Sequence, residues 1–153
     1  EGEQNIMKKP PRSASEAILA GRHWGAVALF GALIAAPVLG ALAYGLQVMG
    51  LQTTEAVTIS FLALASARLW HVFNMRDETS PVLRNEITRN RYVWIAIGFC
   101  AALIVGAVYV PGLNRVLELT PPSFYGWGVA IVAGLIPLLA GQILKSVGLI
   151  RSA

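Results

Sequence analysis

The sequence predicts an all-α, polytopic membrane protein, a bundle of four transmembrane helices with both termini in the cytoplasm. Three observations predict this fold: the apolar residues form four long blocks, charged residues are rare, and most basic residues fall on one side of the blocks. Of 153 residues, 56% are hydrophobic and 13% are charged, and the mean hydropathy is +0.62. This composition excludes an ordinary soluble domain.

The apolar blocks define the predicted spans, because a helix needs about 20 apolar residues to cross a bilayer. They cover residues 24–48, 55–74, 92–110 and 124–146. Residues 1–22 are predicted to be a cytoplasmic juxtamembrane tail, 23–148 the transmembrane domain, and 149–153 a cytoplasmic C-terminal end. The longest connection is expected between the second and third spans, at about residues 75–90.

The basic residues predict the orientation of these spans. One side of the blocks carries Lys8, Lys9, Arg12, Arg22, Arg76, Arg84, Arg89, Arg91, Lys145 and Arg151, whereas the loops on the other side carry only Arg115. Cytoplasmic loops are enriched in Lys and Arg, so we expect both termini in the cytoplasm. The composition, rich in Ala, Gly, Leu and Val, is compatible with a bacterial protein, and we expect an integral protein of the plasma membrane. The net charge of +4 then reflects topology, and we expect a lipid partner and no nucleic acid.

Small residues recur every four positions in three spans, which places them on one face of each helix. The predicted helix-packing residues are Ala32, Ala36, Gly40, Gly98, Ala102, Gly106, Gly126, Ala130 and Gly134. Small side chains let membrane helices approach closely, so these faces predict a tight bundle. Pro37 and Pro137 lie within spans, and we interpret them as fixed kinks rather than hinges.

Arg68 is the most unusual residue of the second span. A charge near the membrane centre costs about 2.5 kcal/mol or more, so it either pairs inside a bundle or extends to the headgroups. Both alternatives are open, because Arg68 is only about 9 Å along the helix from Asn74. Nevertheless, Ser60, Leu64, Arg68 and His71 share one face, whereas Phe61, Leu62, Leu69 and Phe73 occupy lipid-compatible positions. We therefore expect Arg68 to face another helix or a partner protein rather than lipid.

Two residues are candidate polar partners of Arg68. His71 lies one turn further along the second span, and Gln142 is expected near the same leaflet. His71 has no Cys, His or carboxylate neighbour at ligand spacing, and Cys100 is the only cysteine. The sequence therefore predicts no metal site and no cofactor.

Several short motifs lie at or near the ends of the predicted spans. An M-x-x-P-P-R motif precedes the first span, and an F-H-x-F-N-x-R type motif ends the second. The residues of these motifs and of further landmarks are Met7, Pro10, Pro11, Arg12, His71, Phe73, Asn74, Arg76, Asn90, Tyr109, Pro111, Gln142 and Lys145. In their order and spacing they resemble the C-terminal membrane domain of type II P-type cation-transporting ATPases over nearly the whole chain.

The resemblance implies the last four transmembrane helices of such a pump, a unit that supports the ion-carrying helices. The sequence contains no D-K-T-G phosphorylation motif and no nucleotide-binding domain, so we expect no catalysis by this chain alone. By alignment on Phe73 and Asn74, Arg68 falls where relatives place a Glu or Gln cation ligand. A guanidinium cannot coordinate a cation, so the resemblance implies that Arg68 replaces the ligand.

A second hypothesis is an autonomous accessory subunit, derived from a pump, that stabilises another membrane complex. Both hypotheses require other transmembrane helices as partners, either a pump core or a larger complex. A secondary transporter is a third alternative. It is disfavoured because the spans contain no carboxylate in the membrane interior and show no inverted repeat.

Overall fold

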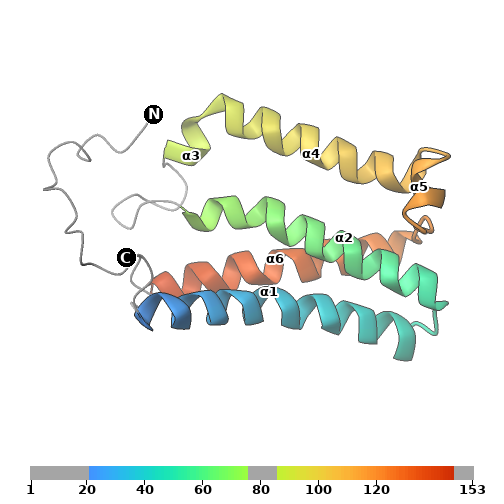
Figure 1. Ribbon diagram of the computed structural model, residues 1–153, viewed down its shortest axis with the longest axis horizontal. Coiled ribbons are helices and arrows are strands. Elements are labelled where there is room, and N and C mark those ends of the chain that lie inside the picture. Colours follow the sequence, from blue (N-terminus) through green and yellow to red (C-terminus); the bar gives the residue numbers. More distant parts are fainter. Residues whose placement is uncertain (1–20, 76–85, 147–153) are drawn as a thin grey trace, which may run out of the picture.

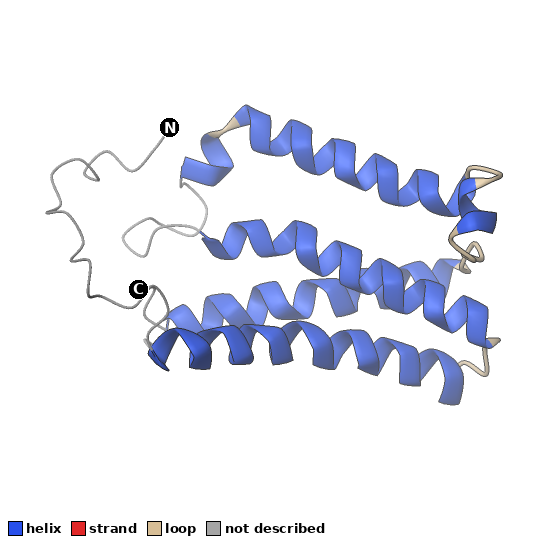
Figure 2. Ribbon diagram, viewed as in Figure 1, coloured by secondary structure: helices blue, strands red, loops and turns tan. Residues whose placement is uncertain are grey.

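The described part of the computed structural model, residues 21–75 and 86–146, consists of helices and connecting loops (Figures 1 and 2). Its long helices are α1 (Gly21–Gln47), α2 (Thr53–His71), α4 (Arg91–Tyr109) and α6 (Phe124–Ser146). The short ones are the 3-10 helix η2 (Val72–Met75), α3 (Glu86–Arg89) and α5 (Leu113–Val116).

The all-helical fold and the four predicted spans are confirmed. Four helices of the described residues are long and apolar enough to cross a membrane, at Val27–Gln47, Thr53–Asn74, Arg91–Tyr109 and Phe124–Leu144. The short helices η2, α3 and α5 in the connections were not expected. Residues 1–20 of the tail predicted at 1–22, most of the connection at 75–90 and the C-terminal end at 149–153 lie outside the described residues.

Side-chain caps begin two of the spans. The Oδ1 atom of Asn90 accepts a hydrogen bond from the backbone N–H of Tyr92 at 3.0 Å, ahead of α4. Ser123 Oγ accepts one from the N–H of Gly126 at 3.2 Å, ahead of α6. The first N–H groups of a helix have no partner within it, so each cap satisfies a donor that would otherwise be exposed near the membrane.

Helices α1, α2 and α6 pack together, and α4 lies on the outer side of α2 (Figure 1). Among the described helices, α2 and α6 share the most extensive contact. Its buried core includes Ile59, Leu62 and Ala130. Leu62, expected at a lipid-compatible position, is instead fully buried. Helix α4 reaches this core through Val108 near its C-terminal end, and Ile95 and Phe99 are each 64% exposed.

Glycines allow the close approach of α6 to α2. A Cβ added at Gly126 would lie 2.9 Å from Ile59 Cδ1, and one at Gly134 would lie 2.6 Å from Ser66 Cβ. The contacts advance in the same direction along both sequences, so α2 and α6 run parallel, as Figure 1 also shows. The absence of a side chain at these glycines is what brings the two backbones together.

Polar side chains of α2 also bind neighbouring segments. Ser60 Oγ donates to the carbonyl oxygen of Val38 in α1 at 3.2 Å, beside Pro37. The hydroxyl of Thr58 donates to Thr54 O at 2.8 Å and accepts from the N–H of Thr120 at 3.0 Å. In hydrocarbon each polar group needs a partner within the protein, so these contacts specify the position of α2.

Gly134→Ala is expected to lower the free energy of unfolding by about 1–3 kcal/mol, the usual range for overpacking. The added Cβ would also lie 3.2 Å from the backbone atoms Ala63 O and Ala67 N, which cannot move independently. Gly98→Ala is the matched control, because a Cβ at Gly98 meets nothing within 4 Å. Unfolding in mixed micelles, followed by circular dichroism, measures both. Equal effects of the two substitutions would contradict the close α2–α6 contact.

Candidate functional site

The candidate site is a groove between α1 and α2 that contains Arg68. Its volume is about 660 Å³, and its apolar lining comes from one face of α1 and from Leu64. The α1 residues are Val27, Phe30, Gly31, Ile34, Ala35, Val38 and Leu39. Arg68 and His71, three residues apart on α2, add polar groups to this lining. An apolar groove with one guanidinium can bind a molecule or helix whose surface is apolar and carries a hydrogen-bond acceptor or a negative charge.

His71 lines the groove, and its ring packs against α1. The imidazole meets the ring of Phe30 edge-on, with centroids 5.4 Å apart and an interplanar angle of 71°. This contact joins α2 to α1, and His71 is partly buried. No group of three or more His, Cys, Asp or Glu side chains that could hold a metal ion occurs within residues 21–75 and 86–146.

Arg68 is exposed on the surface of this chain. Across the described residues, it makes no hydrogen bond or ion pair, so neither His71 nor Gln142 binds the guanidinium. A helix of this length places Arg68 inside the span Thr53–Asn74, about two turns before its end. The charge therefore lies at the edge of the groove and is available to a molecule that covers it.

Gln142 belongs to a separate polar cluster with Asn74, where η2 meets α6. Gln142 Nε2 donates to Asn74 Oδ1 at 2.8 Å and to the carbonyl oxygen of Phe73 at 3.3 Å. The buried Nδ2 of Asn74 donates to the carbonyl oxygen of Pro137 at 3.3 Å. A Cβ at Gly141 would lie 2.6 Å from that Nδ2 atom, so only glycine leaves room for the amide. The cluster fixes the end of α2 against α6.

The predicted packing residues divide into two groups. In α6, Gly126, Ala130 and Gly134 are all buried. The residues of α1 and α4 face outward: Ala32, Ala36, Gly40, Gly98 and Ala102 are exposed, and Gly106 is only partly buried. A Cβ at Gly40 or Gly98 would meet nothing within 4 Å. Thus the small-residue face of α6 packs within this chain, whereas the faces of α1 and α4 are open.

Comparison with known proteins assigns the chain to a family. The family model described as "Cation transporting ATPase, C-terminus" matches residues 1–147. The chain belongs to this cation-transporting ATPase family. It is 31% identical over 150 residues to calcium-transporting ATPase 1 of Lactococcus lactis, covering 95% of this chain and 16% of the relative.

Two further relatives have similar coverage. A calcium-transporting ATPase of Bacillus subtilis is 31% identical over 144 residues, and one of Listeria monocytogenes is 29% identical over 147 residues. The matches cover 93% and 95% of this chain, respectively, and 16% of each relative. The chain thus spans about one-sixth of the length of these relatives, and it corresponds to the C-terminal membrane region of the ATPase family.

The sequence did not reveal the contacts of Asn74 and Gln142, although both residues belong to the motifs of the cation-transporting ATPase family. Each motif lies at the end of a span, and the two residues are 68 positions apart. A polar amide at the end of a span is equally compatible with a headgroup contact. The parallel packing of α2 and α6 is what places the two amides together.

Asn74→Ala is expected to destabilise the bundle by about 1–3 kcal/mol, because it removes a buried side chain and one acceptor of Gln142. A double-mutant cycle with Gln142→Ala should give a coupling energy of about 0.5–1.5 kcal/mol, the range for polar pairs between membrane helices. Gln52→Ala is the control, because Gln52 is exposed and its side chain makes no capping bond. Mixed-micelle unfolding provides the measurement, and strictly additive effects would show that the two amides do not interact.

Proposed function

We propose that this chain is a membrane-embedded support domain of a P-type cation-transporting ATPase, and that it carries out no catalysis by itself. The observation that carries the proposal is the match of residues 1–147 to the C-terminal family model. The curated relatives are calcium-transporting ATPases, and their matched region is about one-sixth of their length. In this proposal, ATP hydrolysis belongs to regions of a pump that this sequence does not contain.

The surface of the bundle supports a packing role. Helix α4 exposes Ile95, Phe99 and Leu103 by more than half, and α1 exposes its small residues Ala32, Ala36 and Gly40. Lipid can cover such faces, but small residues allow another helix to approach closely. We propose that the open faces of α1 and α4 receive the remaining transmembrane helices of the pump.

Arg68 is proposed to act as a fixed positive charge at a former ion site. The groove around it is apolar, and the chain supplies no acceptor for the guanidinium from the described residues. A guanidinium next to lipid is costly, so a carboxylate or carbonyl from the pump core would stabilise it. Its charge would take the place of a bound cation there.

The test of this function is purification of the tagged protein from its native membrane in a mild detergent. We expect the catalytic region of a P-type ATPase to be recovered with the parent chain. Arg68→Gln should preserve this recovery better than Arg68→Glu, because Gln leaves no charge and Glu reverses it. If another membrane complex is recovered instead, the chain is an accessory subunit. If Arg68→Leu assembles as well as the parent, Arg68 only extends to the headgroups and the ion-site proposal fails.

We also propose that the N-terminal end of α1 and the C-terminal end of α6 face the cytoplasm. In a Cys100→Ser background, a Cys at Val116, which is 81% exposed on α5, should react with a membrane-impermeant maleimide added outside intact cells. A Cys at the exposed Arg89 of α3 should react only after the membrane is opened. Labelling of Arg89→Cys but not of Val116→Cys in intact cells would show that the topology is the opposite of the one proposed.

A further inference from the structure

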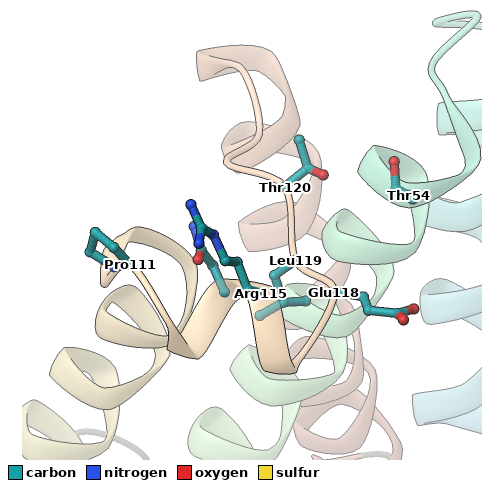
Figure 3. A pocket seen from close by; sticks show the side chains of 7 residues that line it. Thr54, Pro111, Arg115, Glu118, Leu119 and Thr120 are labelled. Carbon is teal, nitrogen blue, oxygen red and sulfur yellow. The ribbon is translucent and has the colours of Figure 1, made fainter.

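A second cavity lies at the opposite end of the bundle from the Asn74–Gln142 cluster. It is an open cleft of about 400 Å³ between the start of α2 and the connection from α4 to α6 (Figure 3). Its lining contains Thr54 of α2 and, from the connection, Pro111, Asn114, Arg115, Glu118 and Thr120. Most of these side chains are polar, unlike those of the groove around Arg68.

The connection that forms the cleft is anchored to the core. Leu119 is 9% exposed and packs in the buried cluster with Ile59 and Val108. The next residue, Thr120, donates its N–H to the hydroxyl of Thr58 at 3.0 Å. These contacts hold the cleft against α2, so its polar side chains project from a fixed backbone.

The cleft carries two opposite charges that do not pair with each other. Arg115 and Glu118 are exposed, and within residues 21–75 and 86–146 neither makes an ion pair. Figure 3 shows the Arg115 side chain directed toward the Pro111 side, whereas Glu118 points away from it. Glu118 also has a backbone φ of 53°, a left-handed conformation that is costly for a residue with a side chain. Two separated charges of opposite sign suit a zwitterionic ligand.

Asn114 provides a further acceptor. Its Oδ1 atom is buried and accepts no hydrogen bond from the part of the chain that the structure describes. Together with the carboxylate of Glu118 and the hydroxyls of Thr54 and Thr120, it gives the cleft several oxygen acceptors in addition to its guanidinium. A primary ammonium group has three N–H donors and matches such a set. The planar guanidinium of Arg115 matches a phosphate.

The surroundings of the cleft belong to the membrane interface. Tyr109 and Trp127 stack with ring centroids 6.4 Å apart, and Trp127 Nε1 donates to the Tyr109 hydroxyl at 3.0 Å. Such residues mark the headgroup level. The neighbouring Leu113, Val116 and Leu117 of the connection are 51%, 81% and 50% exposed. A ligand with acyl chains can cover these apolar side chains, whereas a small soluble zwitterion cannot.

We propose that this cleft binds the headgroup of a phospholipid that has a primary ammonium group, as in phosphatidylethanolamine. Arg115 binds the phosphate, and Glu118 and Asn114 Oδ1 accept hydrogen bonds from the ammonium. The acyl chains lie against the exposed apolar residues of α5. A choline headgroup has the phosphate but no N–H donor, so the site discriminates between the two zwitterionic lipids.

Native mass spectrometry of the detergent-purified protein tests the proposal. The protein is titrated separately with dioleoyl phosphatidylethanolamine, phosphatidylcholine and phosphatidylglycerol, and the fraction carrying lipid gives each affinity. The ethanolamine lipid should bind about 5- to 10-fold more tightly than the choline lipid, as expected for a charge-assisted hydrogen bond. Glu118→Gln should remove this preference. Arg115→Gln should lower the affinity for each of the three lipids by about 3- to 10-fold.

Glu55→Gln and Arg91→Gln are the matched controls, because neither residue lines the cleft. Both controls should leave the three affinities unchanged. Equal binding of the ethanolamine and choline lipids by the parent protein would overturn the proposal, as would a preference that survives Glu118→Gln. Phosphatidylglycerol binding as tightly as phosphatidylethanolamine would show that only the phosphate is recognised. Displacement by soluble phosphoethanolamine at the same concentration as the lipid would identify a free zwitterion instead.

Discussion

The close contact between α2 and α6 is the constraint on which the rest of the structure depends. It requires glycine where α6 meets α2, because a Cβ at Gly134 or Gly141 would lie 2.6 Å from atoms of Ser66 or Asn74. Lipid is as apolar as the helices, so close packing and internal hydrogen bonds, rather than burial from water, hold a membrane bundle together. α2 also binds α1 through Ser60 and the connection before α6 through Thr58.

This arrangement leaves two kinds of surface on the bundle. Inside it, α2 contacts α1, α4 and α6, its small residues Ala56, Ala63 and Ala67 are buried, and its polar residues Thr58 and Ser60 bind neighbouring segments. Outside it, the exposed faces of α1 and α4 and the groove around Arg68 have no partner from the described part of this chain. A bundle that is stabilised internally and open on other faces is suited to supporting further helices. This is the physical basis of the proposed role in a P-type ATPase.

Sequence patterns were sufficient to predict the positions of the spans, because crossing a bilayer imposes a minimum apolar length on each helix. The blocks 55–74 and 124–146 coincide closely with the spans Thr53–Asn74 and Phe124–Leu144. The same patterns predicted less well which face of each helix packs inside the bundle and which faces lipid. Leu62 was expected toward lipid and is buried, because in a membrane protein Leu is equally compatible with lipid and with a core.

The sequence by itself determined the fold class, the number of spans and the family, since these depend on hydropathy and on motifs read along the chain. The tertiary structure decided which small-residue faces are buried: Gly126, Ala130 and Gly134 are, whereas Ala32, Ala36, Gly40, Gly98 and Ala102 are exposed. It also joined Asn74 to Gln142 and placed Arg115 and Glu118 around one cleft. These contacts depend on the relative positions of whole helices, which the spacing of residues within any one helix does not specify.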